Sequence, residues 1–397
     1  MIYTECLGER LSLLGFGTMR LPLLSDKGED IDQEQVNRMV DYAIEHGVNY
    51  FDTAYPYHGG FSERSIGEAL KRYPREQWNL ADKYPGHQFT KKRDIGEVFE
   101  DQLAKCQVDY FDFYLLHNVN ENSIAAYLDE DYGIVRYFAE QKKQGRIRHL
   151  GFSCHGFPEN LEQFLDRWGD EMEFCQIQLN YLDWSLQDAE RKYKILSDHN
   201  VPVWVMEPVH GGMLAKLPEP QEAKLKAVHP DESVASWGFR WLQGLENVHM
   251  VLSGMSSFEQ MVDNVKTFDT RRPLDPEETA LVYEVAETLK SNLPCTACRY
   301  CCAGCPLGLD IPWILANYNE FRVSNSVNLV MRMDSLPKEK RPEACIGCGQ
   351  CSRACPQKID VPKAMHDFGE ALSSMKSWAE IVEERNAAQE RAKAGNT

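Results

Sequence analysis

Nine of the 13 cysteines of this 397-residue chain lie between Cys295 and Cys355. Eight of the nine form two runs with the same spacing, C-x₂-C-x₂-C-x₃-C, and a proline follows each run directly. The first run begins at Cys295, the second begins at Cys345, and Cys302 stands outside the spacing. The other four cysteines are scattered over the rest of the chain. Such an uneven distribution indicates metal ligation rather than a framework of structural disulfides.

The repeated spacing predicts two [4Fe–4S] clusters. It is the pattern of bacterial two-cluster ferredoxins, in which the fourth cysteine of each run ligates the other cluster. About 39 residues separate the two runs, which is longer than in a compact ferredoxin. We expect the first cluster to be held by Cys295, Cys298, Cys301 and Cys355. We expect the second cluster to be held by Cys345, Cys348, Cys351 and Cys305.

Two alternatives to this ligand set stay open. Soft thiolates also bind zinc, and two Cys₄ zinc sites would use the same residues. Zinc sites, however, more often pair short cysteine knuckles across a longer loop, so two identical runs ending in Cys–Pro favour iron–sulfur clusters. Cys302 could also replace Cys301 as a ligand.

The chain before the cysteine runs alternates short β-like segments with amphipathic helical ones. The eight β-like segments cover residues 13–18, 49–54, 79–84, 110–117, 148–155, 174–181, 202–209 and 248–255. Alternation of this kind predicts parallel strands joined by right-handed helical crossovers. Eight units predict a closed (β/α)₈ barrel, which takes ~250 residues. An open doubly wound sheet is the competitor, but LGFGTMRLP after the first segment lacks its G-x-G-x-x-G fingerprint.

We therefore expect an α/β protein with a TIM barrel followed by a small ferredoxin-like iron–sulfur domain that is α+β or rich in helices. The expected parts are a barrel over residues 1–275, a connecting helix over 276–290, the two-cluster domain over 291–375, and a polar helical tail over 376–397.

Four polar residues are candidates for a catalytic site. Asp52, Lys83 and His117 fall at or near the C-terminal ends of consecutive β-like segments, and Tyr57 follows Asp52 by five residues. In (β/α)₈ barrels this end of the strands carries the active site. Taken singly, Asp52 could be a helix cap, Lys83 a solvated charge and His117 a buried core histidine. Their joint placement predicts a catalytic cluster.

The motifs around these residues resemble those of the aldo/keto reductases. FDTAYPY at 51–57, ADKY at 81–84 and YLLH at 114–117 match the order and spacing of that family's catalytic tetrad. The resemblance covers about residues 10–270, and the cysteine tail points to a subgroup of the family. It implies an NAD(P)H-dependent oxidoreductase that passes a hydride to a carbonyl carbon.

The resemblance also implies a role for each residue of the tetrad. Tyr57 would donate a proton to the carbonyl oxygen, and His117 would orient that oxygen. Lys83 would lower the pKa of Tyr57, because a nearby cation favours the phenolate. Asp52 would hold Lys83 in place.

The cofactor contacts implied by the resemblance depart from the family pattern at three positions. Met206 replaces the usual aromatic residue that stacks on the nicotinamide, and Cys154 replaces an asparagine. Gln260 stands where a basic residue usually binds the 2′-phosphate of NADPH, so we expect NADH to be favoured over NADPH. A flavin in the same groove is a further possibility. The implied contacts are Gly17, Thr18, Met19, Ser153, Gln176, Met206, Pro208, Gly254, Gln260 and Asn264.

The overall charge narrows the choice of partners. A net charge of −18 disfavours nucleic acid and anionic membrane surfaces. We find no signal peptide and no apolar stretch of ~18 residues, so we expect a cytoplasmic protein without a membrane span.

Two functions are compatible with these features. The first is reduction of a small-molecule aldehyde, ketone or quinone-like carbonyl, with the clusters relaying electrons to or from a redox protein. The alternative is a non-catalytic redox-sensing or docking module that binds nicotinamide or flavin.

Overall fold

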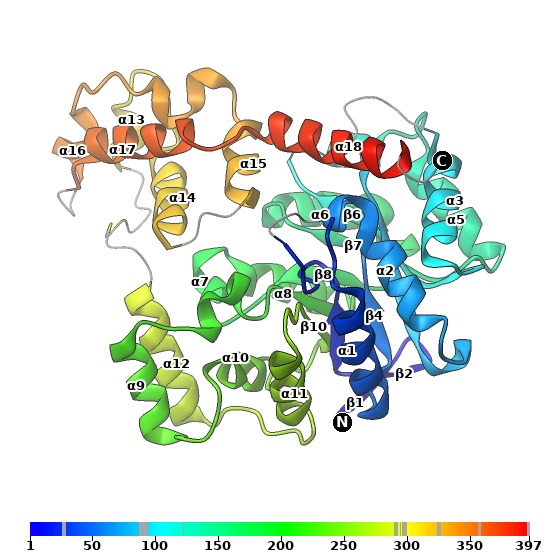
Figure 1. Ribbon diagram of the computed structural model, residues 1–397. Coiled ribbons are helices and arrows are strands. Elements are labelled where there is room, and N and C mark those ends of the chain that lie inside the picture. The colour runs from blue at the N-terminus through cyan, green and yellow to red at the C-terminus, as the bar shows by residue number, and fades with distance from the viewer. Residues whose placement is uncertain are drawn as a thin grey trace. The chain divides into compact units, whose positions relative to one another are not determined.

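The computed structural model describes residues 1–25, 29–86, 94–121, 123–289, 293, 295, 300–323, 327–355 and 359–394. The chain forms two compact units (Figure 1). One unit comprises Met1–Tyr283 with Arg385–Thr397, and the other comprises Glu284–Glu384.

The first unit contains a closed barrel of eight parallel strands, in the order β10-β3-β4-β5-β6-β7-β8-β9. The predicted (β/α)₈ barrel is confirmed, and each strand falls within or next to one of the eight β-like segments. The strands are β3 (Leu14–Gly17), β4 (Tyr50–Asp52), β5 (Asn79–Tyr84), β6 (Phe111–Val119), β7 (Ile147–Cys154), β8 (Cys175–Gln178), β9 (Val203–Met206) and β10 (Val248–Ser253).

Large side chains fill the interior of the barrel near its N-terminal end. Tyr50, Phe113, Phe174 and Trp204 form one buried cluster, with 4.6 Å between the ring centroids of Phe174 and Trp204. Gly151 allows this packing, because a Cβ at this position would lie 2.6 Å from the ring of Phe174. The barrel is therefore a packed core, and a ligand can enter only at the opposite, C-terminal end of the strands.

An antiparallel hairpin of β1 (Tyr3–Cys6) and β2 (Glu9–Ser12) precedes the barrel. Cys6 and Leu11 of this hairpin belong to the same buried cluster as the aromatic residues of the barrel interior. The hairpin thus covers the N-terminal end of the barrel.

Helices surround the strands of the barrel (Figure 1). Four of them begin at an Asp or Ser whose side chain accepts a hydrogen bond from a backbone N–H of the first turn, which typically stabilises a helix by ~1 kcal/mol. The described helices of this part are α1 (Gln33–Glu45), α2 (Phe61–Leu70), α3 (Ile95–Cys106), α4 (Ile124–Leu128), α5 (Ile134–Lys143), α6 (Pro158–Trp168), α7 (Asp183–Leu186), α8 (Ala189–Asp198), α9 (Glu219–Val228), α10 (Val234–Leu242), α11 (Phe258–Thr267) and α12 (Pro276–Leu289).

The second unit has its own apolar core, in which Leu315, Leu329, Met365 and Phe368 are buried. Its described helices are α13 (Tyr300–Ala303), α14 (Ile311–Val323), α15 (Val327–Ser335), α16 (Gln350–Ala354) and α17 (Val361–Ser373). The last helix, α18 (Trp378–Ala394), begins in the second unit and ends in the first.

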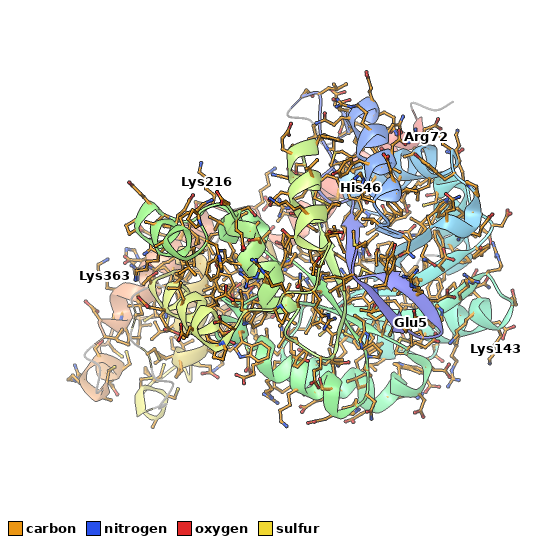
Figure 2. All side chains as sticks on the ribbon, turned by 90° about the horizontal axis from the view of Figure 1, so that it is seen from below. Glu5, His46, Arg72, Lys143, Lys216 and Lys363 are labelled. Carbon is orange, nitrogen blue, oxygen red and sulfur yellow. The ribbon has the colours of Figure 1, made fainter. Side chains whose placement is uncertain are left out.

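Charged side chains such as Glu5 and Lys143 project outward from the surface (Figure 2). None of the helices in the described part of the chain has both the length and the apolarity that a membrane span requires.

Candidate active site and cluster sites

The structure brings the four predicted catalytic residues together at the C-terminal end of the barrel. The Lys83 ammonium donates hydrogen bonds to Asp52 Oδ1 at 2.5 Å, to the Thr53 carbonyl oxygen at 2.7 Å and to the Tyr57 hydroxyl at 3.4 Å. The His117 ring lies nearly perpendicular to the Tyr57 ring, with 6.1 Å between the ring centroids. Asp52 and Lys83 are buried, so their charges act through protein rather than through water.

The loop that carries Tyr57 has an unusual backbone. Tyr57 opens a short 3₁₀ segment, η1 (Tyr57–Gly60), in which His58 has a φ of 52°. The imidazole Nε2 of His58 accepts a hydrogen bond from the Leu21 backbone N–H at 3.1 Å. His58 thus helps to fix the segment next to Tyr57.

The pKa values in this cluster reflect its burial. Burial acts to lower the pKa of Lys83, but the charge and hydrogen bond of Asp52, together with the charges of Tyr57 and Asp82, outweigh it, and the pKa of Lys83 lies above its ordinary value. Lys83 is therefore a cation near neutral pH.

The predicted net lowering of the Tyr57 pKa is wrong for this site. Burial raises the pKa of Tyr57 above 10, and the Lys83 cation offsets only part of that rise. The reason is that a buried phenolate loses more hydration than one neighbouring cation restores. Tyr57 therefore keeps its proton throughout the neutral range.

A cavity of about 540 Å³ opens beside Asp52 and Tyr57. Residues from the ends of β3, β8, β9 and β10 line most of it. Eight of the ten predicted cofactor contacts lie on its wall, namely Gly17, Met19, Gln176, Met206, Pro208, Gly254, Gln260 and Asn264.

Thr18 and Ser153 do not line this cavity, because hydrogen bonds hold both side chains in the protein interior. Thr18 Oγ1 donates to the Asp52 carbonyl oxygen at 2.9 Å, and Ser153 Oγ accepts from the Asn118 N–H at 2.7 Å. Both residues are fully buried. In this structure they support the strand ends rather than the wall of the cavity.

The cavity fits a ligand with an amide group. Gln176 Oε1 lies on the wall, buried and without a hydrogen-bond partner among the described residues. A buried acceptor of this kind needs a donor, and a nicotinamide carboxamide would supply one.

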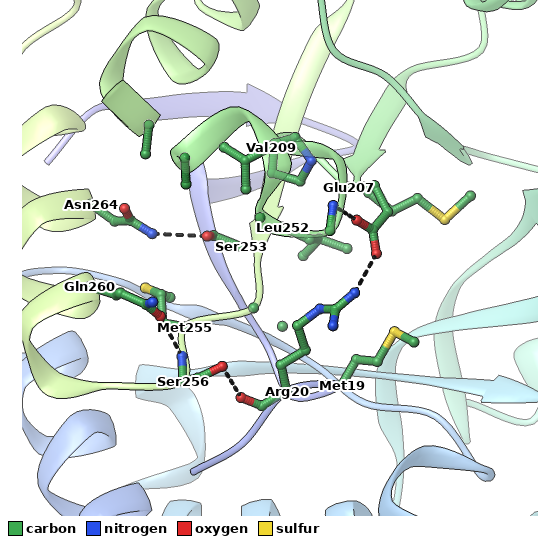
Figure 3. Close-up of a pocket in the computed structure, with 18 of the residues that line it drawn as sticks. Met19, Arg20, Glu207, Val209, Leu252, Ser253, Met255, Ser256, Gln260 and Asn264 are labelled. Carbon is green, nitrogen blue, oxygen red and sulfur yellow. Dashed lines mark hydrogen bonds and ion pairs between the residues drawn. The ribbon is translucent and has the colours of Figure 1, made fainter. Parts of the chain in front are cut away.

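Sequence reasoning missed several residues on the same wall. Arg20 and Glu207 form an ion pair at 3.4 Å beside the cavity, and the Ser256 hydroxyl donates a hydrogen bond to the Arg20 carbonyl oxygen at 2.8 Å (Figure 3). Arg20 and Glu207 both lie in stretches that resemble the family, LGFGTMRLP and EPVHGG, but no sequence signal joins them across more than 180 residues.

The structure places the four predicted ligands of the second cluster around one cavity. Cys345, Cys348 and Cys351 of the second run line it together with Cys305 of the first run. The Leu309 N–H also points to Cys305 Sγ at 3.5 Å. The crossed arrangement that the spacing predicts is thus compatible with the fold of this unit.

The ligand set of the first cluster is described only in part. Cys298 lies outside the described residues, whereas Cys295, Cys301 and Cys355 pack against the core of the second unit. Among the side chains that the structure describes, no three His, Cys, Asp or Glu groups converge on one metal ion.

Comparison with known proteins identifies both parts of the chain. Residues 13–287 match the profile of the "Aldo/keto reductase family", and residues 288–367 match that of the "4Fe-4S dicluster domain". The chain therefore belongs to the aldo/keto reductase family, carries a 4Fe–4S dicluster domain after its barrel, and is an oxidoreductase.

Several relatives share the barrel. The chain is 26% identical over 302 residues to "Uncharacterized oxidoreductase YqkF" of Bacillus subtilis, covering 68% of this chain and 92% of that protein. It is 24% identical over 323 residues to "NADH-specific methylglyoxal reductase" of Escherichia coli, covering 70% and 96%. Among solved structures, aldo-keto reductase AKR11C1 from Bacillus halodurans in its holo form matches with a TM-score of 0.57 and 28% identity, covering 70% of this chain and 93% of that one.

Crossed ligation leads to a testable prediction. Replacing Cys305 with serine should remove the same cluster as replacing Cys348, although Cys305 belongs to the other run. Iron and sulfide content and electron paramagnetic resonance of the reduced protein would report which cluster is lost. Cys302→Ser is the matched control and should keep both clusters. A Cys305→Ser protein that loses the same cluster as Cys295→Ser would contradict the assignment.

Proposed function

We propose that this protein is a nicotinamide-dependent carbonyl reductase whose two [4Fe–4S] clusters relay electrons to or from a redox protein. The substrate class is an aldehyde, a ketone or a quinone-like carbonyl. One observation supports the proposed catalysis: Lys83 contacts both Asp52 and Tyr57 at the edge of a large cavity. This cavity has room for a cofactor, and Gln176 Oε1 on its wall is a buried acceptor without a partner among the described residues.

The bound nicotinamide would supply a hydride to the carbonyl carbon. Tyr57 donates its hydroxyl proton to the carbonyl oxygen, so the products are an alcohol and a tyrosinate that solvent reprotonates. The high pKa of Tyr57 is compatible with this role, because the alkoxide that develops is a stronger base than a tyrosinate. Lys83 stabilises the tyrosinate as it forms, and Asp52 keeps Lys83 charged and in place. His117 orients the carbonyl oxygen from beside the Tyr57 ring.

The cavity wall supports a preference for NADH. Gln260 occupies the expected place of the 2′-phosphate ligand, and Glu259 and Asp263 line the cavity next to it. Among the lining residues that the structure describes, Arg20 is the only basic one, and it already pairs with Glu207. Carboxylates near the adenosine end repel a further phosphate. The relative named as an NADH-specific reductase agrees with this assignment.

The other parts of the proposal rest on the sequence. We keep the domain boundaries of 1–275, 276–290, 291–375 and 376–397, a cytoplasmic location, and the absence of a nucleic-acid partner as proposals. The net charge of −18 supports the last of these.

The role of Tyr57 can be tested by replacing it with phenylalanine. We expect turnover of methylglyoxal with NADH to fall by about 10²–10⁴-fold, because the general acid is lost. NADH binding, followed by its fluorescence, should stay unchanged. Unchanged turnover would show that Tyr57 is not the proton donor and would refute the catalytic role of this site, whereas a wild-type protein without turnover would favour the non-catalytic sensor or docking module.

The cofactor preference can be tested with Gln260→Arg. The new cation should lower the KM for NADPH about tenfold, while the KM for NADH changes little. Gln144→Arg is the control, because it adds the same charge at an exposed helix end that does not line the cavity. A wild-type protein that already prefers NADPH would refute the proposal.

The cluster content can be tested by anaerobic purification. Iron, sulfide, flavin and nicotinamide should be measured in the same sample. We expect eight iron and eight sulfide per chain, since each [4Fe–4S] cluster holds four of each, and no flavin. Stoichiometric flavin would show that another cofactor occupies the groove.

A further inference from the structure

A second group of buried charges lies behind Lys83, on the outer side of β5. Successive residues of a strand point to opposite faces, so Asp82 faces the surrounding helices while Lys83 faces the barrel end. Glu63 on α2 contacts Asp82 there, and Lys105 on α3 contacts Glu63. Asp82 and Glu63 are 0% exposed and Lys105 is 5% exposed.

This group has more carboxyls than cations. Lys105 Nζ lies 3.1 Å from Glu63 Oε2 and 2.7 Å from Asp101 Oδ2. Among the described side chains, no lysine forms an ion pair with Asp82: its Oδ1 accepts from the Lys83 backbone N–H at 2.8 Å, and its Oδ2 lies 3.7 Å from Cys106 Sγ. Two ionised carboxylates in contact repel each other strongly in the protein interior, so a proton must relieve the excess charge.

The hydrogen bonds lead to the same conclusion. Lys105 approaches only Oε2 of Glu63, so with both carboxyls ionised Glu63 Oε1 has no donor among the described side chains. A proton on Asp82 provides that donor, because the Asp82 and Glu63 carboxyls are in hydrogen-bond contact. Burial also raises the pKa of Glu63 to about 7 and that of Asp82 well above its ordinary range. The titratable groups that face the pair are Lys83 on β5, Tyr55 after β4, Tyr114 on β6, and Asp101, Lys105 and Cys106 on α3.

We propose that Asp82 and Glu63 share one proton, and that this pair is a positioning element that keeps Asp82 neutral behind Lys83. The inference deepens the proposed function and rests on it for its catalytic consequence. An ionised Asp82 would place a second carboxylate near the Lys83 cation and weaken the effect of that cation on Tyr57. The tyrosinate would then be harder to form, and proton donation would slow.

The shared proton can be observed without any turnover. A protonated carboxyl has an infrared carbonyl stretch that is separate from the bands of carboxylates. At neutral pH the wild-type holoprotein should show this band, and Asp82→Asn should lose it, because Glu63 then ionises beside Lys105. Glu68→Gln changes an exposed carboxylate on α2, the helix that carries Glu63, and should keep the band. If the wild-type and Asp82→Asn spectra are identical, the inference is overturned.

The effect of the Asp82 charge on Lys83 can be measured from the turnover of methylglyoxal with NADH. In Glu63→Gln the repulsion from the Glu63 carboxylate no longer keeps the proton on Asp82, so a larger fraction of Asp82 ionises and kcat at neutral pH should fall about three- to tenfold. The loss should shrink at lower pH as Asp82 regains its proton. Asp82→Asn and the double variant Glu63→Gln/Asp82→Asn should keep most of the wild-type kcat.

Recovery of kcat in the double variant separates an electrostatic role of Glu63 from a merely structural one. A packing defect at Glu63 would leave the double variant at least as impaired as Glu63→Gln, and that result would overturn the inference. A wild-type protein that does not turn over at all would refute the proposed function instead, and the infrared band would still decide whether the proton is shared.

Discussion

The buried contact between Lys83 and Asp52 is the interaction on which the candidate site depends. Both side chains are almost completely removed from water, and an isolated charge there would cost several kcal/mol. Each ion therefore needs the other, and the pair fixes the ammonium where it also reaches the Tyr57 hydroxyl. If either ion were removed, the site would lose its geometry as well as its charge.

The barrel makes this contact possible. Asp52 is the last residue of β4 and Lys83 the last but one of the neighbouring parallel strand β5, so the strand pairing sets their separation. The aromatic core and the N-terminal hairpin close the other end of the barrel and leave the C-terminal end as the place for a ligand. The same strand β5 carries Asp82 on its opposite face, so one short segment of chain connects Lys83 to a second buried charge cluster.

Sequence reasoning recovered the fold and the tetrad because both follow from local patterns. Each strand is a short apolar run, and the tetrad residues stand at fixed offsets from the ends of those runs. The pKa of Tyr57 was predicted in the wrong direction because its burial depends on residues from several elements. Thr18 and Ser153 were placed on the cofactor groove by motif alone, whereas their hydrogen-bond partners, Asp52 and Asn118, are set by packing. The Arg20–Glu207 pair and the Glu63–Asp82–Lys105 cluster join segments that are distant in sequence, and no single-sequence pattern predicts such contacts.

The central claim is that the Lys83 cation supports proton donation by Tyr57. The most direct measurement is the single-turnover rate of hydride transfer from NADH in Lys83→Met, with NADH affinity measured on the same protein. The account predicts a loss of about 10²-fold or more in that rate, with little change in NADH affinity. A folded Lys83→Met protein that transfers hydride at the wild-type rate would contradict it.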